Sequence, residues 1–413
     1  MKLQKKLLSL CLALCVAATC MIPVHSFAAS GQTYYAAPDG AEGGESTIST
    51  PWSLEYAISQ MSGGDTLILL DGVYHEELSI DGKTDIIIKA QNKGKAVITA
   101  CDSVDSWTED TEIPNVWKAE ATGGVYYGDG NIVFRGGELM QEARWPDLPD
   151  STDDYHALLN LNNYARVEEG ETSANINDSG ADVYIKDADL ATFQEGALVG
   201  AYVWIPAGVA YWSYITPITA FDKASNKIIV ENRFDTQGSY YPNARYNSEN
   251  HIKDNYYIFG CKELLTADGE WYMDEAAGTL YMYTEGTAPT DVELRAREYT
   301  LRIDNSSGVT LDGISFRGGL PAIGSNAQNC TITNARMEAI DYRMPRAMRS
   351  TEKYRAGARG FVLGGTGNTL SNSELVNLYG EGVLLAGNRN RVVNNYIHNY
   401  NFEATYADAV QFK

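Results

Sequence analysis

A seven-residue pattern of apolar and polar positions recurs through residues 309–412. Each copy places an apolar residue at its second and seventh positions and a Gly or Asn at its fourth. The copies are residues 310–316, 331–337, 369–375 and 391–397. A short β-unit with this period cannot bury its apolar side alone, so successive copies must stack on one another. The pattern therefore predicts an all-β chain wound into a solenoid.

Residues 30–103 predict an end cap and the first coils of the same solenoid. The apolar residues between Trp52 and Met61 fall at helical spacing, and Gly63 with Gly64 ends the helix. A short amphipathic helix here would cover the open end of the first coil, where an exposed strand edge invites aggregation. Apolar runs between Gly and Asp turns then predict short strands, at residues 66–70, 78–80, 86–88 and 97–98.

Residues 104–296 interrupt the pattern with a stretch that shows no regular period. All Trp residues except Trp52 lie in it. Alternating apolar and polar positions at 197–204 and 227–230 predict strands, so we expect an inserted β-rich domain, of the sandwich type. The coils resume over residues 297–413.

The end of the sequence predicts the start of one more strand. Residues 409–412 align with 382–385, and the sequence then stops at Lys413 without a capping helix. Because an uncovered strand edge is a liability, we expect either a fragment of a longer protein or a second chain over this end. We favour the fragment.

The first 29 residues have the pattern of a secretory signal peptide, with a basic start, an apolar run over 7–24 and small residues at the exit. The alternative is a transmembrane anchor, for which this run is barely long enough. Cleavage removes Lys2, Lys5 and Lys6 and no acid, so the formal net charge moves from −22 to −25. Such a surface repels nucleic acid and anionic membranes. We expect a secreted monomer that binds neither.

The remaining cysteines and histidines do not indicate a metal or disulfide scaffold. Cys101, Cys261 and Cys330 are an odd and scattered set, and Cys330 falls within a repeat, where we expect a small buried thiol. No zinc spacing, GxSxG motif or P-loop is present in the sequence. We expect no cofactor, with calcium near residues 39–45 left open, although the ligand pattern there matches no EF-hand loop.

The opening of the chain resembles a known group of proteins. Residues 34–40, Pro51 with Trp52, and residues 64–74 are similar to the start of secreted bacterial proteins of the pectin lyase-like superfamily. This resemblance implies a right-handed parallel β-helix. Members are mostly polysaccharide hydrolases, lyases and epimerases, alongside adhesins and phage tailspikes, and the fold does not choose among them. Residues 143–146 and 269–281 also resemble segments of an insertion in some β-helix glycosidases.

Aligning the strands that start near 360, 382 and 409 places Arg359, Glu381 and Asp408 in one column, at corners where side chains can face solvent. Stacked coils are about 4.8 Å apart. Two carboxyl groups this close can share one proton, and an acid beside a base is what glycosidic cleavage needs. The placement is similar to that of the catalytic aspartates in polygalacturonase-type glycosidases, although those enzymes carry different motifs here. The alternative is that both are solvated corner acids.

Further candidates for substrate binding surround this column. Residues 343–359 hold six positive charges, including Arg355 and Arg359, which could bind a substrate carboxylate or sulfate. Charge compensation of nearby acids is the alternative. Tyr406 precedes Asp408 by two residues. His398 follows an inward-pointing Ile397, so we expect it to point outward, one coil from Val376, where it contacts substrate or solvent.

Two other sets of residues have structural interpretations that we favour. Asn residues in the repeats, namely 334, 368, 372, 390 and 394, are expected to form ladders that satisfy one another down the solenoid. Aromatic residues of the insertion could stack on sugars, but packing of the inserted domain explains each one more simply. The aromatic set is Tyr240, Tyr241, Tyr246, Tyr256, Tyr257, Trp204 and Trp212.

The sequence thus favours a secreted glycoside hydrolase that uses Glu381 and Asp408 on a polysaccharide or oligosaccharide, with Arg359 orienting the substrate. A polysaccharide lyase or epimerase acting on uronic acids is the first alternative, because of the basic segment. The second is a non-catalytic carbohydrate-binding or wall-associated β-helix protein. The substrate sugar, its linkage and the anomeric outcome are not specified by the sequence.

Overall fold

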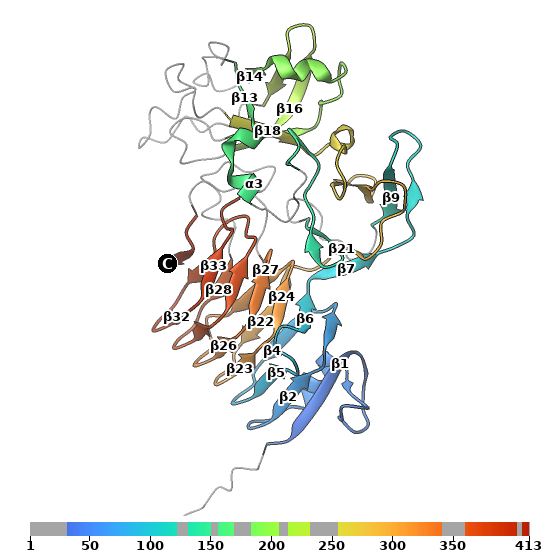
Figure 1. Cartoon of the computed structure of the whole chain (residues 1–413). Helices are drawn as coiled ribbons and strands as arrows, with labels where there is room; N and C mark the ends of the chain where they lie inside the picture. Colours follow the sequence, from blue (N-terminus) through green and yellow to red (C-terminus); the bar gives the residue numbers. More distant parts are fainter. Residues whose placement is uncertain are drawn as a thin grey trace, which may run out of the picture.

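The computed structural model describes residues 31–121, 131–149, 156–168, 183–205, 214–231, 255–340, 360–402 and 407–412. Three parallel sheets, here called sheets I, II and III, dominate the molecule, and their strands lie in a stack (Figure 1). In spatial order, sheet I contains β1 (Thr33–Ala41), β2 (Thr66–Leu69), β5 (Ile87–Ala90), β23 (Thr310–Asp312), β26 (Thr331–Thr333), β29 (Thr369–Ser371) and β32 (Arg391–Val393). Sheet II contains β3 (Gly72–Tyr74), β6 (Ala96–Thr99), β24 (Ser315–Arg317), β27 (Arg336–Glu338), β30 (Glu374–Val376) and β33 (Tyr396–His398). Sheet III contains β4 (Leu78–Asp81), β22 (Tyr299–Asp304), β25 (Leu320–Ile323), β28 (Phe361–Leu363), β31 (Val383–Leu385) and β34 (Val410–Phe412).

The chain visits these sheets in the fixed order I, II, III, and we call each such passage a coil. Strands β29, β30 and β31 form one coil, and β32, β33 and β34 form the next. Equivalent positions of the repeat pair across coils: Leu370 pairs with Val392 in sheet I, and Leu375 pairs with Ile397 in sheet II. The predicted stacking of the four copies is therefore confirmed by the strand register.

The recurrence of Gly or Asn at the fourth position of the repeat has a steric cause. Gly313, Asn334, Asn372 and Asn394 are each the first of the two residues that link sheet I to sheet II, with φ between 52° and 74°. This left-handed conformation excludes most side chains and suits Gly and Asn. The turn points the second and seventh positions of each copy inward, where residues such as Leu370 and Leu375 are fully buried in one continuous core.

The N-terminal part adds a helix to the end of this core. Helix α2 (Leu54–Gln60) buries Leu54, Ala57 and Ile58 against the first coils, as its helical spacing predicts. Strands β2, β4 and β6 fall where apolar runs predict them, whereas the run at 86–88 forms a strand one residue later. Strands β1 and β3 were not predicted, because the Pro and Gly residues within β1 and the short length of β3 hide their apolar alternation.

Between β6 and β22 the described strands are antiparallel and belong to three further sheets. The first contains β7 (Cys101–Val104), β10 (Val133–Arg135), β11 (Glu138–Leu139) and β21 (Val292–Arg295). The second contains β12 (Arg144–Trp145), β13 (Ala165–Arg166), β14 (Val183–Lys186), β15 (Tyr202–Ile205), β16 (Tyr214–Asp222), β17 (Lys227–Val230) and β18 (Asn255–Phe259). The third contains β8 (Thr108–Glu109), β9 (Val116–Glu120), β19 (Trp271–Asp274) and β20 (Thr279–Tyr283). Short helical segments accompany them, namely α3 (His156–Leu159), η1 (Leu161–Asn163), η2 (Ala188–Thr192) and η4 (Lys262–Leu264).

An apolar cluster joins this antiparallel region to the coils. Phe134 and Leu139, from β10 and β11, pack with Ala339, Tyr379 and Phe402, which follow strands of sheet II. The rings of Tyr379 and Phe402 meet edge to face, with their centroids 6.2 Å apart. The antiparallel region therefore lies against the corner at which the chain passes from sheet II to sheet III.

One buried acid of the antiparallel region makes folding stability depend on pH. Glu270 is 5% exposed, and its carboxylate accepts hydrogen bonds from the backbone N–H groups of Thr266 and Ala267, both at 3.1 Å. Burial, with the negative charge of Asp147 adding to it, raises the pKa of Glu270 from 4.5 to about 7, although the backbone hydrogen bonds oppose this change. Between pH 4.5 and about pH 7, Glu270 is therefore protonated to a greater extent in the folded state than in the unfolded state.

Stability is consequently expected to fall as pH rises from 4.5 to about 7 and to change no further from this group above that pH. At about 1.4 kcal/mol per pKa unit, the effect is on the order of 3 kcal/mol. Glu270→Gln keeps an acceptor oxygen without the charge, so this variant should be the more stable protein at pH 8 and show a flatter profile. Urea unfolding at a series of pH values measures this. The exposed Glu285→Gln is the control, and an identical profile for Glu270→Gln and the wild-type protein would contradict the prediction.

Candidate functional site

Glu381 and Asp408 occupy equivalent positions on neighbouring coils. Val383 of β31 pairs with Val410 of β34, and the backbone N–H of Gly382 donates to the carbonyl oxygen of Asp408 at 3.1 Å. Each acid therefore stands two residues before a paired position at the start of a sheet III strand. Neighbouring strands lie about 4.8 Å apart, so the two backbones are one strand spacing from each other.

The expectation that both corner acids can face solvent holds for only one of them. Asp408 is exposed, but Glu381 is only 9% exposed. The preceding residues Leu378 and Tyr379 are buried, and Tyr379 belongs to the apolar cluster shared with the antiparallel region. The sequence of the repeat alone does not reveal that a segment from elsewhere in the chain covers this corner.

Three other predicted site residues lie outside the described residues. These are Arg355, Arg359 and Tyr406. The whole basic segment 343–359, on which the lyase interpretation depends, also lies outside the described residues.

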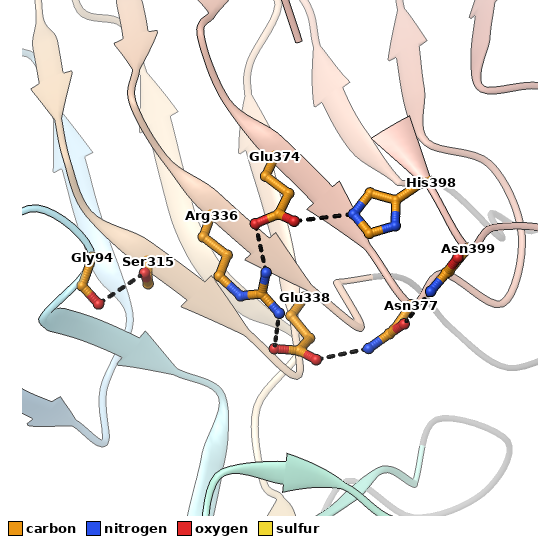
Figure 2. A network of polar contacts seen from close by, with 8 residues as sticks. All are labelled: Gly94, Ser315, Arg336, Glu338, Glu374, Asn377, His398 and Asn399. Atoms are coloured by element: carbon orange, nitrogen blue, oxygen red, sulfur yellow. Dashed lines mark hydrogen bonds and ion pairs between the residues drawn. The ribbon is translucent and has the colours of Figure 1, made fainter. Parts of the chain in front are cut away.

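His398 lies where the repeat predicts it, in β33 opposite Val376 of β30. Its Nε2 atom is 3.0 Å from Oε1 of Glu374, and its ring stacks on that of Tyr396 with centroids 4.1 Å apart. The other oxygen of Glu374 accepts a hydrogen bond from Arg336 of β27 at 2.5 Å. Figure 2 shows His398, Glu374 and Arg336 reaching one another across the outer face of sheet II. The histidine is thus held by a carboxylate of the neighbouring coil.

The same network continues toward the sheet III side of the molecule (Figure 2). Arg336 donates to Glu338 at 3.1 Å, and the other oxygen of Glu338 accepts from Asn377 at 2.8 Å. Asn377 is followed four residues later by Glu381. A chain of polar contacts therefore runs from the centre of sheet II to the segment that carries the buried acid.

The electrostatics of Glu374 favour its charged form. Partial burial would raise the pKa of Glu374, but hydrogen bonds from His398 and Arg336 outweigh it and lower this pKa. Glu374 therefore carries a negative charge at neutral pH and is unsuited to donate a proton. Its place in the network fits binding and orientation of neighbouring groups better than acid catalysis.

Sequence reasoning missed Arg336, Glu338 and Glu374, although a signal for them exists. The repeat buries its seventh position, so the sixth and eighth positions of every copy face outward on sheet II. The sixth positions are Ser315, Arg336, Glu374 and Tyr396, and the eighth are Arg317, Glu338, Val376 and His398. Comparing the sixth and eighth positions across the copies would have identified the residues of this network.

The aromatic residues of the antiparallel region serve packing where the structure describes them. Trp204 and Tyr257 are 5% and 4% exposed, and their rings stack with centroids 5.3 Å apart. Tyr256 is fully buried. The packing interpretation is therefore confirmed for these three. Tyr240, Tyr241, Tyr246 and Trp212 lie outside the described residues.

The remaining expectations concern metals, thiols and membranes. Cys101, Cys261 and Cys330 are buried free thiols, as the sequence suggests for Cys330. Within the described ranges, no group of three or more His, Cys, Asp or Glu side chains could hold a metal ion. No described helix is both long and apolar enough to cross a membrane.

Comparison with known proteins relates the fold to a solved structure. No protein-family model matches the chain, and no curated protein matches it. This chain is similar to a solved structure of a glycoside hydrolase, at 12% sequence identity and a TM-score of 0.57. The match covers 86% of this chain and 80% of the glycoside hydrolase chain. The structure of a complex of XylC with xylose matches at 14% sequence identity, and the match covers 92% of this chain and 56% of the XylC chain. Its TM-score of 0.44 supports no argument. The first likeness is one of fold.

Proposed function

We propose that the protein is a secreted carbohydrate-active enzyme that hydrolyses glycosidic bonds of a polysaccharide. In this proposal the three parallel sheets form a right-handed parallel β-helix of the pectin lyase-like superfamily, and substrate binds where the chain enters sheet III. The observation that carries the proposal is the placement of Glu381 and Asp408 at equivalent positions of neighbouring coils. The likeness in fold to a glycoside hydrolase supports it.

The different exposure of the two acids suggests a division of roles. Burial disfavours the ionised form of a carboxyl group, so we assign proton donation to the leaving-group oxygen to Glu381. Asp408, which is exposed, then attacks the anomeric carbon or activates a water molecule that does so. The separation of the two carboxyl groups decides between these routes, with about 5–5.5 Å for retention and about 6.5–9.5 Å for inversion.

Substrate contacts are proposed on both sides of this pair. Arg359 precedes a strand in the same register, two residues before Phe361, which pairs with Val383. We assign to it the orientation of a substrate hydroxyl or carboxylate, and we propose further substrate contacts for Arg355 and Tyr406. His398, held by Glu374, is available to hydrogen-bond a sugar hydroxyl from sheet II. The pattern of residues 1–29 supports export of the enzyme.

Product analysis tests this function against its alternatives. The protein is incubated with arabinoxylan, mixed-linkage β-glucan, galactomannan and polygalacturonate, and reducing ends and ultraviolet absorbance are followed. Hydrolysis predicts new reducing ends without the absorbance of an unsaturated uronide. Reducing ends accompanied by that absorbance would instead identify a lyase. No product from any polymer, with binding retained, would favour a carbohydrate-binding protein without catalysis.

A further inference from the structure

An open depression lies at the junction of sheets I and II, on the opposite end of the sheet II strands from Glu381. Its volume is about 650 Å³. It is lined by the starts of β27, β30 and β33 together with the turns that precede them, and by Lys93 and Gly94, which precede β6. The residues that matter most for its chemistry are Asn334, Arg336, Asn372, Glu374, Asn394 and Tyr396.

Amide side chains form one wall of this depression. Asn394 donates from Nδ2 to Oδ1 of Asn372 at 2.8 Å, and Asn372 donates from Nδ2 to Oγ1 of Thr333 at 3.3 Å. Both Asn side chains are exposed. An amide has two donor hydrogens and an acceptor oxygen with two lone pairs, so each retains capacity for a ligand. The amides repeat once per coil, a spacing comparable with the length of one pyranose unit.

An exposed aromatic ring stands beside these amides. Tyr396 is 64% exposed, yet its ring is stacked on His398 at 4.1 Å with an interplanar angle of 18°. His398 is in turn held by Glu374 (Figure 2). A ring supported in this way has a fixed orientation without being covered. A rigid amphipathic surface of this kind suits the C–H face of a sugar ring, at low cost in side-chain entropy.

The charged side chains that line the depression are Lys93, Arg336 and Glu374, and the Nζ of Lys93 donates to Oδ1 of Asn334 at 3.5 Å. Arg336 contacts both Glu374 and Glu338, at 2.5 and 3.1 Å. Its guanidinium group is therefore already paired with two carboxylates, and the chain as a whole is strongly acidic. An anionic ligand would have to compete with these carboxylates and with that field. A neutral, hydroxyl-rich ligand would not.

We propose that this depression is a second, non-catalytic binding site for a neutral oligosaccharide chain, which lies across three coils with one sugar ring on Tyr396. The inference goes beyond the proposed hydrolysis, because the site is built from the starts of sheet II strands and Glu381 follows their ends. It would keep the enzyme on a polymer while the carboxylates act elsewhere.

Affinity electrophoresis in native gels tests the proposal, with arabinoxylan, mixed-linkage β-glucan, galactomannan or polygalacturonate as the immobile ligand. We expect at least one neutral polymer to retard the wild-type protein. Tyr396→Ala should weaken the association constant roughly tenfold, as loss of a central aromatic contact does. Tyr396→Phe keeps the ring and should retain most of the affinity. Asn372→Ala should weaken binding as well. The exposed Leu161→Ala, in the antiparallel region, is the control and should migrate as the wild-type protein does.

Several outcomes would overturn the site. These are retardation by polygalacturonate alone, no retardation by any neutral polymer, or equal retardation of Tyr396→Ala, Asn372→Ala and the wild-type protein. Folding of each variant is checked by circular dichroism and by migration in a gel without polymer. Glu381→Gln should keep the retardation of the wild-type protein. Tyr396-dependent retardation without any hydrolysis by the wild-type protein would overturn the proposed function and leave this site standing.

Discussion

Glu381→Gln and Asp408→Asn are each expected to lower kcat for polysaccharide hydrolysis by roughly 10²–10⁴-fold, with little change in KM. Each replacement keeps the size of the side chain and removes a carboxyl group that, in the proposed mechanism, transfers a proton or attacks the anomeric carbon. Because the groups act in the transition state rather than in binding, the loss should appear in kcat. Initial rates of reducing-end release across substrate concentrations separate the two constants.

A matched control comes from another corner of the same fold. Glu76 is a partly buried acid two residues before β4, a sheet III strand several coils away from Asp408. Glu76→Gln changes the same chemical group in a similar setting and should leave the rate unchanged. Circular dichroism shows that each variant is folded. Wild-type turnover in both Glu381→Gln and Asp408→Asn would remove these residues from the reaction.

Asn368→Ala is expected to lower the free energy of unfolding by about 4 kcal/mol, because it leaves several buried backbone groups unpaired. Asn368 is fully buried. Its Oδ1 accepts from the backbone N–H of Cys330 at 2.8 Å, and its Nδ2 donates to the carbonyl oxygens of Gly364 and Ala327 at 2.7 and 3.1 Å. Urea unfolding followed by circular dichroism measures the change.

The comparison that isolates this effect is Asn326→Ala. Asn326 is exposed, and its Nδ2 donates to the side chain of Asn305 rather than to buried backbone. Its loss should alter stability by less than about 0.5 kcal/mol. Equal stability of Asn368→Ala and Asn326→Ala would show that the buried amide does not hold neighbouring coils together.

Much of the parallel part of the fold was predictable, because its repeat has a steric and an apolar signature in every copy. A left-handed residue at the fourth position and inward residues at the second and seventh specify the turn, the strands and their register. The expected Asn ladder is present only in part. Asn394 donates to Asn372, but Asn372 donates to Thr333 and Asn334 donates to Asp312 instead of to the next amide. The antiparallel region has no repeat, so its strand order depends on contacts between distant segments that no local pattern encodes.

The candidate site was predictable to the same extent as the register. The alignment of Glu381 with Asp408 follows from counting residues between strands. The burial of Glu381 does not, because Tyr379 packs against Phe134 and Leu139, residues more than two hundred positions earlier in the chain. The residues that contact His398 occupy outward-facing positions of the repeat. An analysis based on apolar periodicity identifies the inward-facing positions only.

The proposal that Glu381 and Asp408 act as one catalytic pair is tested most directly by the double variant Glu381→Gln with Asp408→Asn. Residues that act as a unit lose no more together than either loses alone. We therefore expect the kcat of the double variant to lie within a few-fold of the kcat of the less active single variant. Losses that multiply would show two groups acting independently, and turnover at the wild-type rate would show that neither takes part.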